Sequence, residues 1–117
     1  IRPTVFRDVS NEMQIAREEI FGPVLCAIPF DSEKEAVQLA NDSAYGLAAG
    51  VYSDSSARSQ RIAMQLEAGM IFVNRYGCYD VCSPFGGIKE SGWGSEMGLD
   101  GLLQFANKKS VWMYWGE

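Results

Sequence analysis

The fold is decided by the stretch VLCAIPFDSEKEAVQLA, residues 24–40, in which an apolar run leads directly into a helix start. Residues 24–30 are continuously apolar, as expected of a strand that is covered on both faces. Ser32 is followed three residues later by Glu35, the spacing of a capping box that satisfies two unpaired amides of a helix start. The stretch therefore predicts a buried strand followed by a helix.

The same order of elements continues toward the C-terminus. Leu47–Ser53 reads as a second strand, and Asp54–Ser56 reads as the N-cap region of a second helix. This helix is expected to stop at Gly69 as a C′ glycine, and Met70–Asn74 reads as a third strand. Strand, helix, strand, helix and strand with short connections predict an α/β fold, a parallel sheet of βαβαβ units with right-handed crossovers.

The flanks of this region are less regular. Pro3–Val9 is a candidate short strand, and Asn11–Glu19 a candidate flanking helix with Asn11 as its N-cap. Glu96–Phe105 has leucines at helical spacing, although two glycines weaken it. Ser110–Trp115 is aromatic and β-prone, and as a terminal strand it would be an exposed edge unless another strand pairs with it.

Length and charge exclude several classes of protein. With 117 residues, 47% of them hydrophobic, the chain is one domain or a piece of one and is too apolar to be disordered. The net charge is −5 and the ten Lys and Arg residues are scattered, which argues against nucleic-acid binding. No apolar run approaches the roughly 18 residues that a membrane span needs. Because the chain begins with Ile1 rather than Met, we expect that residues have been removed before it.

Three cysteines, Cys26, Cys78 and Cys82, are an odd number that fits poorly with a closed disulfide framework, so the cytoplasm is the expected location. Cys26 falls in a predicted buried strand, where a thiol behaves as a small apolar group. Cys78 and Cys82 fall in a loop, and the chain has no His to activate them. We expect no catalytic cysteine and no metal site here.

A glycine-dense segment covers residues 83–94, and two nucleotide-binding interpretations of this region fail. Gly92–Gly98 has one residue too many before its last glycine for a dinucleotide fingerprint, and no strand leads into it. Gly87–Gly92 has the spacing of a phosphate loop, but Trp93 stands where Lys is required. The better interpretation is that these glycines let the backbone bend tightly.

Two adjacent carboxylates, Glu18 and Glu19, precede a Gly-Pro pair that stops a helix. An ionised carboxylate has two acceptor oxygens, which suit both hydroxyls of a ribose. The alternative is that both side chains are solvated charges near a helix C-terminus, where a carboxylate is slightly unfavourable. Composition alone favours this alternative.

Three motifs together resemble the C-terminal region of NAD(P)-dependent aldehyde dehydrogenases. They are E-E-I-F-G-P at residues 18–23, G-x-[IV]-x-V-N at 69–74 and P-F-G-G-x-K-x-S-G-x-G at 84–94. The resemblance covers essentially the whole chain. It implies that residues 1–108 are the C-terminal part of a catalytic domain and that 109–117 are an oligomerisation-type strand.

The resemblance also implies roles for individual residues. Glu19 would hold the nicotinamide ribose of NAD or NADP, and Phe21 would pack near the nicotinamide ring. Phe85 would line the aldehyde tunnel, with Tyr76 and Tyr79 shaping its mouth. The substrate would be an aldehyde that is oxidised to a carboxylic acid, in a homo-oligomer that pairs through residues 110–115.

The family's nucleophilic cysteine, general-base glutamate and nucleotide-binding domain lie in upstream motifs that do not occur here. We therefore expect no turnover by the isolated chain. Ser95 stands where the family usually has Arg, and Phe105 where Tyr is common. The alternative function is a stand-alone, non-catalytic α/β module that binds a partner through its edge strand.

Overall fold

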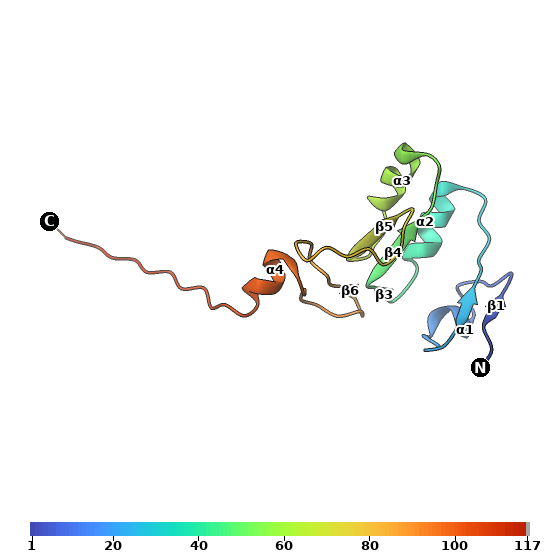
Figure 1. Ribbon diagram of the computed structural model, residues 1–117, viewed down its shortest axis with the longest axis horizontal. Coiled ribbons are helices and arrows are strands. Elements are labelled where there is room, and N and C mark those ends of the chain that lie inside the picture. Colours follow the sequence, from blue (N-terminus) through green and yellow to red (C-terminus); the bar gives the residue numbers. More distant parts are fainter. Residues whose placement is uncertain (117) are drawn as a thin grey trace.

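Two βαβ units with parallel strands form the framework of the chain, which confirms the α/β class (Figure 1). The structure is a computed structural model that describes residues 1–116. The first unit is β1 (Thr4–Phe6), α1 (Gln14–Arg17) and β2 (Val24–Cys26), with β1 parallel to β2. The second is β4 (Ala48–Val51), α3 (Ser56–Ala63) and β5 (Met70–Val73), with β4 parallel to β5.

The expected single parallel sheet is not formed within residues 1–116. Their strands form three separate two-stranded sheets, the third of which is an unpredicted antiparallel pair of β3 (Tyr45–Gly46) and β6 (Ile88–Lys89). The strand expected at 24–30 ends at Cys26, because a strand exists only where a neighbouring backbone completes its ladder. Within residues 1–116, the last backbone bonds between the two segments are those of Ala27, whose amide donates to the Phe6 carbonyl at 2.8 Å and whose carbonyl accepts from the Val9 amide at 3.3 Å.

Both predicted serine caps are confirmed. At the start of α2 (Glu33–Asn41), the Ser32 hydroxyl accepts from the Glu35 amide at 3.2 Å. The Glu35 carboxylate turns back and accepts from the Asp31 amide at 2.8 Å, one residue before the position expected of a capping box. At the start of α3, the Ser55 hydroxyl accepts from the Arg58 amide at 3.3 Å.

The expected cap at Asn11 is wrong. Helix α1 begins only at Gln14, and its N-cap, Met13, makes no side-chain cap bond. The Asn11 amide instead donates to the Leu39 carbonyl and to the Asp42 carboxylate, both at 3.0 Å. Its side chain is used for a tertiary contact that ties the first βαβ unit to the end of α2.

The expected C′ role of Gly69 is also wrong. Helix α3 ends at Ala63 with Met64 as its C-cap, five residues before Gly69. The Gly69 amide donates to the Gly46 carbonyl at 2.9 Å, so Gly69 leads directly into β5. Packing between chain segments, rather than helix termination, explains this glycine.

The C-terminal part of the chain extends away from the rest of the molecule (Figure 1). Helix α4 (Gly98–Leu103) is the short, glycine-weakened helix expected there, and residues 107–116 form neither helix nor strand. The edge strand expected at 110–115 is therefore not formed, because no backbone lies beside it; its predicted segment, 109–117, also extends one residue past the described part. This tail contributes to a radius of gyration of 19.5 Å, against about 13 Å for a compact chain of this length.

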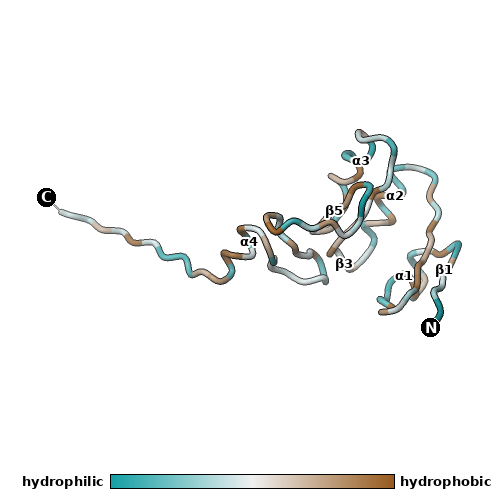
Figure 2. The backbone as a smooth tube through the Cα atoms, viewed as in Figure 1, coloured by the Kyte–Doolittle hydropathy of each residue, from teal (hydrophilic) through white to brown (hydrophobic). Residues whose placement is uncertain are grey.

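Little apolar surface is buried. Among residues 1–116, only three hydrophobic side chains are buried, those of Val9, Val37 and Val51. Hydrophobic residues continue along the segment that leaves β2 for α2 (Figure 2), where Leu25 and Phe30 are 61% and 58% exposed. Exposed apolar surface of this extent is typical of an interaction face.

Candidate functional site

The two adjacent glutamates at the end of α1 differ in the partners of their side chains. Glu18 is the C-cap of the helix, and both of its carboxylate oxygens accept from the Gln14 side-chain amide at 2.9 Å. Within residues 1–116, Glu19 makes no side-chain hydrogen bond or ion pair. The carboxylate at position 19 therefore keeps its full acceptor capacity for a ligand.

Glu19 and Phe21 line the same cavity, which has a volume of about 650 Å³. The Phe21 side chain is 91% exposed, and its backbone has a φ of +54°. A bulky residue in this left-handed region is uncommon and is typical of functionally constrained backbone. The following turn is tight, because the Val24 amide donates to the Gly22 carbonyl at 2.7 Å.

A second cavity, of about 430 Å³, is bordered by aromatic rings. The Tyr79 ring lies 5.4 Å from the Phe85 ring and 5.7 Å from the Phe72 ring, in tilted and edge-on arrangements that aromatic pairs prefer. Cys78, Asp80 and Met97 also line this cavity. Phe72, on β5, is a cavity residue that the sequence analysis missed, although it stands inside one of the three motifs.

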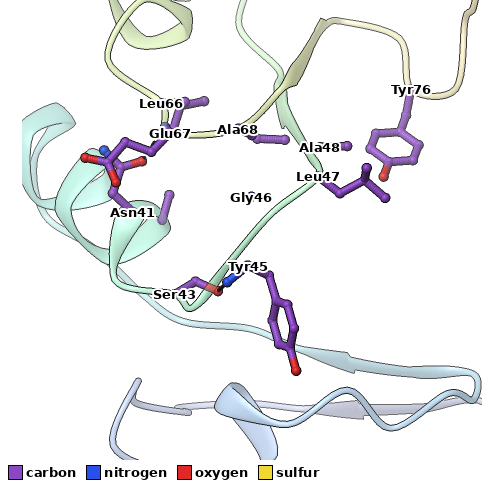
Figure 3. A pocket seen from close by; sticks show the side chains of 12 residues that line it. Asn41, Ser43, Tyr45, Gly46, Leu47, Ala48, Leu66, Glu67, Ala68 and Tyr76 are labelled. Atoms are coloured by element: carbon purple, nitrogen blue, oxygen red, sulfur yellow. Dashed lines mark hydrogen bonds between the residues drawn. The ribbon is translucent and has the colours of Figure 1, made fainter. Parts of the chain in front are cut away.

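Tyr76 lies beside the aromatic cluster but lines a different cavity, of about 260 Å³ (Figure 3). Its ring lies 5.0 Å from that of Phe72. In Figure 3 it stands at one end of the cavity, beyond Leu47 and Ala48, while Asn41 and Glu67 stand at the other. The structure thus joins Tyr76 to Tyr79 and Phe85 through the ring of Phe72.

The glycine-rich segment is closed on itself by backbone bonds. Phe85 and Glu96 exchange two backbone hydrogen bonds, both of 2.7 Å. The Ser91 hydroxyl accepts from the Gly46 amide at 3.0 Å, and the Gln104 side chain donates to the Ser95 carbonyl. This closure holds Phe85 at the edge of the aromatic cavity.

Lys89, in the same motif, binds other segments of the chain through its side chain. Its ammonium donates to the Asn41 carbonyl at 2.7 Å and pairs with the Glu67 carboxylate at 2.8 Å, and its side chain is only 24% exposed. The Asn41 side chain in turn accepts from the Glu67 amide at 2.8 Å. The lysine therefore joins β6 to the end of α2 and to the turn before β5.

The candidate residues form two groups rather than one site. The cavity of Glu19 and Phe21 and the cavity of Tyr79 and Phe85 share no lining residue. Over residues 1–116, no cluster of three or more ligating side chains that would suit a metal ion is found. The same residues contain no helix with the length and apolarity of a membrane span.

The sequence profile of the aldehyde dehydrogenase family matches residues 1–111. The chain belongs to the aldehyde dehydrogenase family. It is 47% identical to the betaine aldehyde dehydrogenase of Sinorhizobium fredii over 100% of this chain and 24% of that protein. It is also 47% identical to the NADP/NAD-dependent aldehyde dehydrogenase PuuC of Escherichia coli, over 97% of this chain and 23% of that protein.

Solved structures of aldehyde dehydrogenases have the same fold. The crystal structure of a Mycobacterium tuberculosis aldehyde dehydrogenase complexed with NAD+ matches 100% of this chain and 24% of that chain, with a TM-score of 0.94 and 48% identity. The chain thus spans about a quarter of the length of the curated relatives it matches.

Proposed function

We propose that this chain provides the C-terminal part of the catalytic domain of an enzyme that oxidises an aldehyde to a carboxylic acid with NAD(P). The observation that carries this proposal is the match of the aldehyde dehydrogenase family to residues 1–111, with Glu19 and Phe21 on one shared cavity. A nicotinamide cofactor would supply the hydride acceptor. The residues of this chain would bind and orient it.

Glu19 is the proposed ligand of the nicotinamide ribose. Its carboxylate has no partner among the described side chains, whereas that of Glu18 is already bound by Gln14. A carboxylate that accepts two ribose hydroxyls forms charge-assisted hydrogen bonds, which are stronger than neutral ones. Phe21, exposed beside it, would offer an aromatic surface to the nicotinamide ring.

The aromatic cavity is the proposed contribution to the aldehyde tunnel. Phe85 and Tyr79 line it directly, and Tyr76 shapes it indirectly by packing on Phe72. The two groups of residues are separate in this chain. A substrate between them would therefore need the nucleophilic cysteine and the remaining domain surfaces, which by the resemblance lie outside these residues.

We also propose that the isolated chain has no dehydrogenase activity, that the enzyme works in the cytoplasm, and that it is a homo-oligomer. Residues 110–115 are its proposed pairing strand. They carry five exposed apolar side chains in succession, from Val111 to Trp115, and pair with no strand among residues 1–116. Such an unpaired, aromatic segment is suited to pairing with a strand of another chain.

The second candidate function is a non-catalytic module that binds a partner through the same segment. The same exposed tail, from Val111 to Trp115, favours it, because partner binding needs no active site.

Transplantation into a relative tests the enzymatic proposal. In PuuC of E. coli, the 113 matching residues would be replaced by this chain, and NAD-dependent aldehyde oxidation would be measured. The proposal predicts turnover by the chimera and none by the 117-residue chain alone. A folded chimera without turnover would favour the non-catalytic module, and turnover by the isolated chain would refute its predicted inactivity.

A further inference from the structure

Cys78 and Cys82 are both exposed and lie in the loop between β5 and the glycine-rich segment. We propose that these two thiols form a reversible disulfide that locks this loop beside the aromatic cavity. The proposal rests on the loop itself and does not require the dehydrogenase activity.

The backbone between the two cysteines already turns. The Ser83 amide donates to the Asp80 carbonyl at 3.0 Å, which closes a turn over residues 80–83. The Cys82 amide also donates to the Asp80 carboxylate at 2.8 Å, a second bond that stabilises this turn. Cys82 lies within this turn and Cys78 lies two residues before it, so a further tightening of the same loop is what brings their Cα atoms to the separation of about 4.4–6.8 Å that a disulfide requires.

The backbone directly before Cys78 is free to change its conformation. Gly77, directly before Cys78, has a φ of +72°, and no heavy atom lies within 4 Å of the position that a Cβ would take there. A glycine in this conformation changes its dihedral angles at little steric cost. Only three residues separate the two cysteines, so the dihedral angles of Tyr79, Asp80 and Val81 set the distance between the thiols. When these angles change to bring Cys78 toward Cys82, a rotation at Gly77 lets the chain before Cys78 follow.

Hydrogen peroxide is the proposed oxidant. The thiolate of one cysteine attacks the peroxide, the O–O bond breaks, and a sulfenic acid forms as water leaves. The second thiolate then attacks the sulfenic sulfur, the S–S bond forms, and a second water leaves. The two thiols are together oxidised by two electrons, and one peroxide is reduced to two waters. An added dithiol reverses the reaction by thiol–disulfide exchange.

The disulfide would act on the aromatic cavity. Cys78 lines this cavity directly, and Tyr79, the next residue, contacts the rings of Phe72 and Phe85. Cys26 provides an internal contrast, because it is half-buried in β2 and its thiol donates to the Ile15 carbonyl at 3.5 Å. Exposure to the oxidant and a nearby second thiol thus distinguish the loop pair from Cys26.

Peptide mapping of the natural-length protein tests the proposal. Trypsin cuts after Arg75 and Lys89, so Cys78 and Cys82 fall in one peptide, residues 76–89, whereas Cys26 falls in the peptide 18–34. The protein would be treated with hydrogen peroxide, alkylated with iodoacetamide and digested. We expect peptide 76–89 to become mainly an unalkylated form that is lighter by two hydrogen atoms, and dithiothreitol to restore double alkylation.

Variants complete the test. Cys78→Ser and Cys82→Ser should each abolish the lighter form of the peptide, whereas the matched control Cys26→Ser should leave it unchanged. The proposal is overturned if peptide 76–89 remains doubly alkylated after oxidation. It is equally overturned if the two cysteines are oxidised separately to sulfinic acids, or are joined to other peptides rather than to each other.

Discussion

Gly69 and Gly86 lie in direct backbone contact, so that a Cβ atom on Gly69 would collide with the carbonyl oxygen of Gly86. The contact joins the start of β5 to the glycine-rich segment, which lies seventeen positions further along the chain. A Cβ on Gly86 would in turn lie 2.5 Å from the Gly94 carbonyl. Three glycines of the motifs at residues 69–74 and 84–94 are thus stacked backbone on backbone. This stacking places Phe85 on the cavity that Phe72 and Tyr79 also line.

Gly69→Ala should therefore destabilise the protein by about 2 kcal/mol or more, because the colliding atom belongs to the backbone and cannot rotate away. The matched control is Gly50→Ala, on β4, where the nearest heavy atom to the new Cβ is 3.5 Å away. That change should alter stability by less than about 1 kcal/mol. Urea unfolding midpoints measure both, and equal midpoints for the two variants would contradict the close packing at Gly69.

Asn74 connects the ends of β4 and β5 by two hydrogen bonds. Its side-chain oxygen accepts from the Ser53 amide at 2.8 Å, and its side-chain nitrogen donates to the Ser53 carbonyl at 2.9 Å. Its φ is +57°, a conformation that Asn tolerates better than most residues. Asn74→Ala should cost about 2–3 kcal/mol, from two lost hydrogen bonds and the backbone strain.

Asn74→Gly separates these two contributions. Glycine removes the hydrogen bonds but accepts the positive φ, so this variant should be less destabilised than Asn74→Ala. Thermal unfolding of both variants measures the difference. A glycine variant as unstable as the alanine variant would show that the strain at residue 74 contributes nothing.

Much of the fold was predictable from local chemistry. The serine caps at Ser32 and Ser55 depend on residues close in sequence, and the parallel β4–β5 pair follows from the order strand, helix, strand; these predictions are confirmed. The use of Asn11 and Gly69 depends on contacts with residues distant in sequence, Asp42 and Gly86, and no local pattern reveals such contacts.

The candidate site was predictable only in part. Glu19, Phe21, Tyr79 and Phe85 were identified through the motif resemblance, and the structure assigns them to two cavities. The sequence did not reveal that Phe72 links Tyr76 to Tyr79, because ring packing depends on how β5 and the following loop meet. The expected strand at 110–115 needs a partner backbone, which a single sequence cannot specify.

Glu33 provides a pH-dependent test of the contact between α2 and α3. Hydrogen bonds from Arg61 are the main cause that lowers the pKa of this carboxyl, and its charge and that of Arg58 lower it further. Because the folded pKa is depressed, the stabilisation is present above the unfolded value of about 4.3 and is lost as the pH falls through the folded pKa. Glu33→Gln should therefore be less stable than the wild type near neutral pH and equally stable in acid.

Urea midpoints measured from neutral to acidic pH provide this comparison. Glu12→Gln is the matched control, because the Glu12 side chain is 86% exposed and only approaches Arg17 at 3.4 Å. A constant gap between Glu33→Gln and the wild type at every pH would show that the ion pair is not its cause.

The central claim is that Glu19 binds the cofactor ribose, and the KM for NAD of two glutamate variants in the PuuC chimera tests it most directly. Glu19→Gln keeps the size but loses the charge, so we expect the KM for NAD to rise by about tenfold or more, the value of charged hydrogen bonds. Glu18→Gln, whose carboxylate is bound by Gln14, should change this KM by less than about twofold. Equal effects of the two substitutions, or a larger effect at Glu18, would contradict the assignment.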